Sequence, residues 1–300
     1  MRPDPATGPA IVAIGGGHGL AASLRALRRI THHLTAVVSV ADNGGSTGRL
    51  RRSSAQVAPG DLRKCLVALA EPNSALARSM EFRFGEGELD GHAVGNLLLS
   101  AMTEVCGGLT LALDELSSLL GVTGRVLPAT VEPVDLVAFT DDGALVRGQV
   151  AVMGTTGIDR VMLAPAQPHV APNVLALIEA AELIVLGPGS LFTSVLAATA
   201  VPAVTEAIGR ADAHVLYVCN LRPQEGETSG YGVDDHVAAL MRHGLTPDTV
   251  LYDPSEIGGA EGVPGAISAR LAATDTNMHD SYLLEQALRA VLERIPSTRN

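Results

Sequence analysis

The segment 10–40 constrains the fold more than any other part of this sequence. Residues 10–14 form a short apolar run, and residues 15–20 then read Gly-Gly-Gly-His-Gly-Leu. The leucines and the isoleucine within 20–30 recur at the spacing of one helical face. A second, β-branched run follows at 34–40, so the segment predicts a β-α-β unit with parallel strands.

The same order of elements returns in the second half of the chain. Residues 174–181 predict a helix, 183–186 a buried strand, and a glycine turn at 187–190 precedes another helix. Further strands are expected at 214–219 and 249–252. Hydrophobic residues make up 47% of the chain but aromatic residues only 3%, which suits parallel strands buried on both faces. We therefore predict a doubly wound, mostly parallel, Rossmann-like α/β fold.

The middle of the chain breaks this alternation. Short strands at 134–140 and 144–150, joined by Asp-Asp-Gly, predict a hairpin. We expect residues 122–165 to form a small antiparallel excursion from the main sheet. Residues 1–9 are rich in Pro and Gly and are expected to form a disordered tail, and 10–300 a single domain. The other expected helices are 61–70, one from the Gly-His segment at 91–92 through 105, 111–120, and 282–295.

Charge and cysteine content exclude several classes of protein. Acidic residues outnumber basic ones 32 to 21, a net charge of −11, which argues against nucleic acids and anionic membranes as partners. Cys65, Cys106 and Cys219 lie in apolar runs without metal-ligand spacing, so we expect reduced, buried thiols and no metal site. No apolar run reaches transmembrane length. A cytoplasmic protein without membrane insertion is the expectation.

The stretch 40–51 gathers an unusual set of polar groups behind the second predicted strand. Its glycines permit close approach of the backbone to a ligand, while Asp42, Asn43, Ser46 and Arg49 offer a carboxylate, an amide, a hydroxyl and a guanidinium. A turn that only reversed the chain would need two such residues. The pattern favours an anion-binding or nucleotide-binding loop over a purely structural loop.

Glycine turns precede the helices expected after residues 15–19 and 187–190. Such turns direct backbone N–H groups and the positive end of the helix dipole toward a phosphate. The first has the spacing G-x-G-x-G rather than that of a dinucleotide fingerprint, and no Gly-Lys-Ser/Thr follows, which excludes a P-loop NTPase. A tight structural turn remains an alternative. So does a nicotinamide oxidoreductase, in which Asp42 would bind the ribose of the dinucleotide cofactor. No nucleophile elbow occurs.

Two further helix starts carry candidate ligand contacts. Asp61 is placed to cap the helix that begins near Gly60, and Arg63 and Lys64 in its first turn oppose the dipole preference. Such cations suggest a nearby anion, although a solvated pair is the commoner explanation. His92 stands before the helix that contains Asn96 and is either a cap residue or a ligand contact. In an open parallel sheet the carboxyl ends of the strands share one edge, where a ligand crevice lies.

Six ordered motifs together resemble one protein family. The chain is similar, over about residues 10–295, to the gluconeogenesis factors (YvcK-like) of the 2-phospho-L-lactate transferase (CofD-like) superfamily. The motifs are Gly15-Gly16-Gly17 with Gly19-Leu20, residues 42–51, Pro59-Gly60-Asp61-Leu62-Arg63, Gly91-His92 with Gly95-Asn96-Leu97, Gly187-Pro188-Gly189-Ser190-Leu191 with Thr193-Ser194, and Cys219-Asn220 with Gln224 and Gly226-Glu227-Thr228.

The resemblance implies a UDP-sugar-binding protein, with UDP-N-acetylglucosamine as the ligand. It also implies a regulatory role that links carbon metabolism to cell-wall synthesis and cell shape, with a protein partner and without an established reaction; a homo-oligomer is compatible with it. From the motifs we expect ligand contacts, and no catalytic residues, at Gly16, Gly17, His18, Asp42, Asn43, Ser46, Arg49, Asp61, Arg63, His92, Asn96, Gly189, Ser190 and Asn220.

Several positions depart from the family pattern. His18 replaces a usual threonine, Lys64 a common asparagine, and Asn43 a usual second aspartate; Arg222, Pro223 and Glu225 alter the loop after Asn220. A pair of carboxylates would suit Mg²⁺, and the loss of one weakens such a site. Binding is therefore favoured over the alternative, a CofD-like transferase that moves a phosphate-linked group from a nucleotide donor with Asp42 holding Mg²⁺.

Overall fold

A central parallel sheet flanked by helices forms the body of the protein. The computed structural model describes residues 4–54, 57–273 and 278–295. Seven parallel strands follow the order β10-β9-β8-β7-β1-β2-β3, and three antiparallel strands form a second sheet in the order β5-β4-β6. The predicted α/β class, with its mostly parallel sheet and small antiparallel part, is confirmed.

The main-sheet strands are β1 (Ile11–Gly15), β2 (Leu34–Val38), β3 (Arg125–Pro128), β7 (Leu183–Leu186), β8 (His214–Val218), β9 (Thr249–Tyr252) and β10 (Ala266–Ser268). The second sheet contains β4 (Asp135–Thr140), β5 (Leu145–Arg147) and β6 (Ile158–Ala164). The helices are η1 (Pro5–Thr7), α1 (Gly17–Leu27), α2 (Gly45–Ser54), α3 (Gly60–Leu69), α4 (Ala75–Glu81), α5 (Val94–Val105), α6 (Leu109–Leu120), α7 (Gln149–Met153), α8 (Val174–Glu179), η2 (Leu191–Val195), α9 (Leu196–Thr199), α10 (Pro202–Arg210), α11 (Val233–Arg242) and α12 (Ser281–Leu292).

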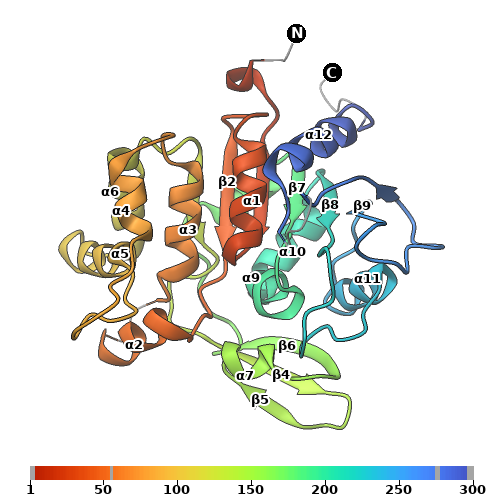
Figure 1. Ribbon diagram of the computed structural model, residues 1–300. Coiled ribbons are helices and arrows are strands. Elements are labelled where there is room, and N and C mark those ends of the chain that lie inside the picture. Colours follow the sequence, from red (N-terminus) through yellow and green to blue (C-terminus); the bar gives the residue numbers. More distant parts are fainter. Residues whose placement is uncertain (1–3, 55–56, 274–277, 296–300) are drawn as a thin grey trace.

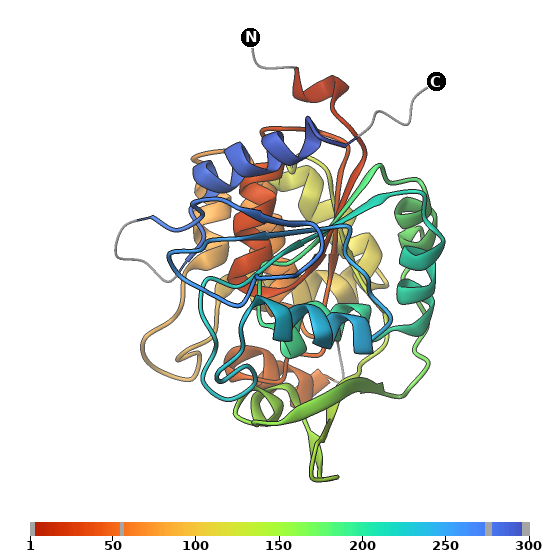
Figure 2. The same cartoon turned by 90° about the vertical axis from the view of Figure 1, so that its right-hand side faces the viewer.

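The strand order reverses between β1 and β7. β1 leads through α1 to β2 on one side, whereas β7 leads through η2, α9 and α10 to β8 on the other. Parallel crossovers share one hand, so the two connections cover opposite faces of the sheet. Figure 2 shows this arrangement, with red α1 and blue α12 on one face and the green to teal helices α8 and α10 on the other. Ligands of open α/β sheets bind at such a reversal.

The antiparallel sheet is smaller than the predicted excursion. β3 lies within 122–165, but it pairs in parallel with β2, with Thr35 opposite Arg125. Only β4, β5 and β6 form the separate sheet. Figure 1 shows this sheet, with α7, at the end of the molecule opposite the two chain termini, where α2 also lies. A short buried run such as Val126-Leu127 does not reveal which strand will pair with it.

Other segments differ from their sequence-based expectation. Residues 45–51 of the stretch 40–51, which was expected to be a loop, lie in α2, and residues 149–150, expected as strand, begin α7. The strand β10 lies in the segment 258–280, which carried no clear pattern. In the expected tail, residues 1–3 lie outside the described part, and Pro5–Thr7 form one turn of 3-10 helix.

The core is built from aliphatic side chains, as the composition predicted. All five residues of β1 and of β2 are buried, which explains why both strands are continuously apolar rather than alternating. Cys65 and Cys219 are buried free thiols as expected, whereas Cys106 is only half-buried. Within the described ranges no single helix is long and apolar enough to cross a membrane. The bent pair Leu191–Thr199 and Pro202–Arg210 reaches that length and apolar composition only when its two helices are counted together.

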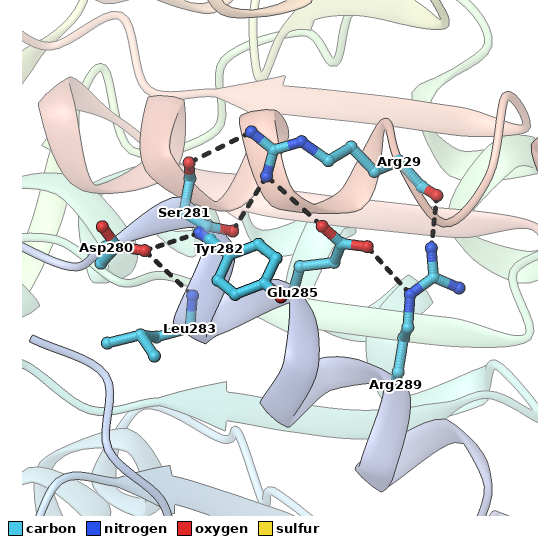
Figure 3. A network of polar contacts seen from close by, with 7 residues as sticks. All are labelled: Arg29, Asp280, Ser281, Tyr282, Leu283, Glu285 and Arg289. Atoms are coloured by element: carbon cyan, nitrogen blue, oxygen red, sulfur yellow. Dashed lines mark hydrogen bonds and ion pairs between the residues drawn. The ribbon is translucent and has the colours of Figure 1, made fainter. Parts of the chain in front are cut away.

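A buried glutamate fastens the C-terminal helix α12 to the end of α1. Glu285 is 1% exposed and lies between two arginines, as Figure 3 shows. Arg29 contacts Glu285 Oε2 at 3.5 Å, and Arg289 Nε donates to Oε1 at 3.0 Å. Arg289 also donates to the Arg29 carbonyl at 2.5 Å, and the Asp280 carboxylate caps the start of α12. The network holds α12 against the helix whose other end borders the candidate site.

Candidate functional site

The loops that follow β1 and β7 are in direct contact. A Cβ atom at Gly19 would lie 2.4 Å from the Pro188 carbonyl oxygen, closer than real Cβ atoms come to any neighbour. Ser23 Oγ donates to the Gly187 carbonyl at 2.9 Å, and Gly189 N–H donates to Asn220 Oδ1, behind β8, at 3.1 Å. The ends of three neighbouring strands therefore meet at the reversal of the sheet, as the two glycine turns predicted.

A large cavity lies over this junction, which we call the switch-point cavity. Its volume is about 830 Å³, within the range of small-molecule sites in proteins. The described residues that line it include eight of the expected ligand contacts: Gly16, Gly17, His18, Asp42, Asp61, Gly189, Ser190 and Asn220. Other polar side chains on its wall are Arg25, Ser39, Lys64, Gln149, Thr193, Ser194, Arg222, Gln224 and His279.

Charged and titratable side chains lie close together in the wall of this cavity. Lys64 Nζ is 2.9 Å from Asp61 Oδ1, and both side chains are largely buried. Burial raises the pKa of Asp42, whose neighbour Asp61 adds to the shift while the Gly44 N–H opposes it from 2.8 Å. Burial and the Lys64 charge lower the pKa of His18, so its imidazole is mostly neutral at pH 7. The Lys64 ammonium group is thus held in the cavity wall, beside the neutral imidazole of His18 and the carboxyl group of Asp42.

A second, smaller cavity adjoins the first; we call it the arginine pocket. It has a volume of about 400 Å³ and is lined by Asp42, Gly44, Gly45, Ser46, Thr47, Arg49, Gly60, Arg63, Lys64, Arg83, Gly91 and Asn96. Asp42 and Lys64 line both cavities. The expected contacts Ser46, Arg49, Arg63 and Asn96 therefore lie here, next to the switch-point cavity rather than within it.

The last two expected contacts lie outside both sets of lining residues. His92 Nδ1 is 3.0 Å from Ser46 Oγ, which accepts from Asn96 Nδ2 at 3.2 Å, so His92 supports the wall of the arginine pocket. Burial and the Arg49 charge lower the pKa of His92. The Asn43 amide oxygen accepts from the Val150 N–H at 3.1 Å, which ties the loop 42–45 to α7.

Comparison with known proteins places the chain in a family. The sequence profile of the 2-phospho-L-lactate transferase CofD family matches residues 11–282, which is most of the chain. The chain belongs to this CofD family. Crystal structures agree: that of protein BH3568 from Bacillus halodurans superposes with a TM-score of 0.88 at 34% identity, covering 94% of this chain and all of that one.

Named relatives point the same way. The gluconeogenesis factor of Halalkalibacterium halodurans is 41% identical over 247 residues, which cover 81% of this chain and 77% of that protein. A relative from Deinococcus radiodurans, which carries the same name provisionally, is 47% identical over 255 residues. The match covers 83% of this chain but 54% of that protein, so the chain spans about half of the length of this longer relative.

In this CofD-family chain the groups around Asp42 do not form a good divalent-metal site. Asn43, which stands in place of a second aspartate, is engaged by Val150, and Lys64 already neutralises Asp61. A hard cation such as Mg²⁺ needs several oxygen ligands, preferably carboxylates.

Glu227 is a buried residue that contacts the wall of the switch-point cavity through Thr193. It is 1% exposed, and its Oε2 accepts from the Thr193 N–H at 3.1 Å at the start of η2. Its other oxygen, Oε1, is buried without a partner among the described residues. Burial raises the pKa of Glu227 to about 7, although the hydroxyls of Thr193 and Ser190 oppose the shift. The Glu227 carboxyl group thus caps the segment that carries Ser190 and Thr193.

We expect Glu227→Gln to stabilise the protein at alkaline pH. The pKa of Glu227 is higher in the folded chain than in the unfolded chain, so its contribution to stability is complete below about pH 4.5 and is lost as the pH rises through 7. Glutamine cannot ionise, so the variant should gain on the order of 2 kcal/mol at pH 8 and little at pH 5. Urea unfolding at both pH values measures this.

The exposed Glu225 in the same loop provides the control, because Glu225→Gln should change stability equally at the two pH values. A Glu227→Gln variant less stable than wild type at pH 8 would show that the carboxylate form is the one that the fold prefers.

Sequence reasoning did not assign several residues of the two cavities. Lys64 was noted as a departure but not as a contact, yet it lines both cavities. His279 lies in a segment without a recognisable pattern, and Arg83 follows α4, so neither gave a signal. Glu227 belonged to a quoted motif and could have been found from it. Arg25 lies in the last turn of α1, away from the glycine turn that marked the site in the sequence.

Proposed function

We propose that this protein binds a nucleotide sugar of the UDP-N-acetylglucosamine class in the switch-point cavity. The observation that carries the proposal is the contact between the loops after β1 and β7, with Asp42 and Asn220 on the same rim. Glycine turns at such a reversal present backbone N–H groups to a diphosphate. Three cations line the same cavity: Arg25, Lys64, which pairs with Asp61, and Arg222, which pairs with Glu256.

The remaining wall suits the nucleoside and the sugar. Ser190, Ser194, Asn220 and Gln224 offer hydroxyl and amide groups that can hydrogen-bond sugar hydroxyls and a uracil edge. The volume of about 830 Å³ accommodates a ligand larger than a mononucleotide. The same cavity has no evident nucleophile paired with a base among the described lining residues, which favours binding over turnover.

We propose further that ligand binding serves regulation. The named relatives are gluconeogenesis factors, which supports a role in carbon metabolism. In this proposal the protein reports on nucleotide-sugar supply and so links carbon metabolism to cell-wall synthesis. In that role a protein partner in the cytoplasm would bind the loops around the ligand. The bound ligand, rather than a product, would be the signal.

Calorimetric titration tests the proposal. UDP-N-acetylglucosamine should give saturable heat with one site per chain, and N-acetylglucosamine alone, which lacks the diphosphate, should give none at the same concentrations. UMP should bind more weakly than the complete ligand, because only the diphosphate spans both glycine turns. Folded protein that gives no heat with millimolar UDP-N-acetylglucosamine would reject the proposal, and turnover of the ligand would replace it with the transferase alternative.

A further inference from the structure

We propose that the arginine pocket is a separate binding site for a small oxyanion of the phosphate or carboxylate class. The pocket collects guanidinium groups from three elements: Arg49 on α2, Arg63 on α3 and Arg83 in the loop after α4. Lys64 stands at its border with the switch-point cavity. The proposal does not depend on which nucleotide occupies that larger cavity.

The three guanidinium groups of the pocket, unlike Lys64, are not neutralised by ion pairs with described residues. Within the described part of the chain no carboxylate lies within ion-pairing distance of Arg49, Arg63 or Arg83. Each guanidinium instead donates to a backbone carbonyl: to that of Asp90 at 2.5 Å, of Met80 at 3.2 Å and of Gly91 at 2.8 Å, respectively. These bonds fix the guanidinium groups in place but leave their charge for a ligand.

Two buried atoms on the wall of the pocket have no hydrogen-bond partner among the residues that the structure describes. Arg63 is 4% exposed, and its Nε–H lacks an acceptor; Asn96 is 2% exposed, and its Oδ1 lacks a donor. Buried polar atoms are seldom left without a partner, because the desolvation cost is then not recovered. An anionic oxygen satisfies the arginine, and a hydroxyl of the same ligand, such as that of a monoprotonated phosphate, satisfies the amide.

The backbone is shaped to let these side chains pack together. A Cβ atom at Gly95 would lie 2.8 Å from Arg63 Cδ, and one at Gly91 would lie 3.1 Å from an Arg49 terminal nitrogen. Both glycines thus leave room for an arginine beside the pocket. Burial and the charge of Arg83 lower the pKa of Arg63, while Glu81 and Asp61 oppose that shift. Facing cations held this close are stabilised when an anion binds between them.

Calorimetry with inorganic phosphate tests the site. The double variant Arg49→Gln and Arg83→Gln removes two exposed arginines, so it should fold, whereas substitution of the buried Arg63 carries a greater risk to folding. We expect the double variant to bind phosphate at least tenfold more weakly than wild type, because charge-assisted hydrogen bonds are lost. The matched control is Arg210→Gln, since the exposed Arg210 on α10 lines neither cavity and its loss should leave phosphate binding unchanged.

Repeating the titration with protein saturated by UDP-N-acetylglucosamine identifies the source of the oxyanion. Unchanged phosphate affinity would support a separate site for a small ligand, and lost affinity would overturn it, because the pocket would then hold a group of the nucleotide ligand that reaches across Asp42 and Lys64. Wild-type protein that does not bind phosphate, or a double variant that binds it as tightly as wild type, would overturn the proposal. Binding of the nucleotide sugar itself is measured separately, so failure here leaves the proposed function standing.

Discussion

Gly19→Ala is expected to abolish tight nucleotide-sugar binding and to destabilise the fold. The added methyl group would lie 2.4 Å from the Pro188 carbonyl oxygen and 2.9 Å from Gly189 Cα, both of them backbone atoms that cannot rotate away. The turns after β1 and β7 must therefore separate. We expect a loss of about 1–3 kcal/mol in the free energy of unfolding and at least a tenfold loss of affinity, because the two halves of the diphosphate cradle no longer match. Urea unfolding and calorimetry measure the two effects.

Gly209 offers the matched control for this substitution. It lies in α10 with open space where a Cβ atom would be added. Gly209→Ala should therefore leave ligand affinity unchanged and stabilise the helix by about 0.5–1 kcal/mol. Wild-type affinity in a folded Gly19→Ala variant would mean that contact between the two turns is not needed for binding.

Glu285→Ala should cause the largest loss of stability at a site remote from the cavities. The carboxylate is buried between Arg29 and Arg289, and its removal leaves Arg289 with one fewer partner in a largely buried position. Breaking one partner out of a buried ion pair typically costs 3–5 kcal/mol, but Arg29 is 42% exposed and water partly compensates. We expect a loss of about 3 kcal/mol, measured as a shift of the urea midpoint.

The exposed Glu293 at the end of the same helix is the control, since a substitution at an exposed surface position such as Glu293→Ala should change stability by less than about 0.5 kcal/mol. Equal effects of the two substitutions would show that the network does not hold α12 to α1.

The segments that could be placed correctly from the sequence are those whose burial follows from their own apolar composition and periodicity. β1, α1, β2 and β7 are apolar with clear periodicity, and the reversal of the sheet follows from the β-α-β rule once they are recognised. Their glycine turns were informative because close backbone contact at Gly19 admits no side chain. The fold and the convergence of the loops were therefore predictable.

Other features depend on contacts that no local pattern records. α2 contains a single apolar residue, Leu50, and so shows no apolar stripe, which is why the stretch 40–51 was expected to be a loop. β3 pairs with β2 across a long intervening helical region, and its own four residues do not specify that partner. The division of the expected contacts between two cavities likewise depends on where Arg49 and Arg63 pack, and Gly91 and Gly95 leave room for these side chains.

A crystal structure with bound UDP-N-acetylglucosamine tests the central claim most directly. The account predicts the diphosphate in the switch-point cavity, within hydrogen-bonding distance of both glycine turns, near residues 16–19 and 188–190, with Lys64 beside it. An ordered nucleotide sugar bound elsewhere on the protein, with this cavity empty, would contradict the account.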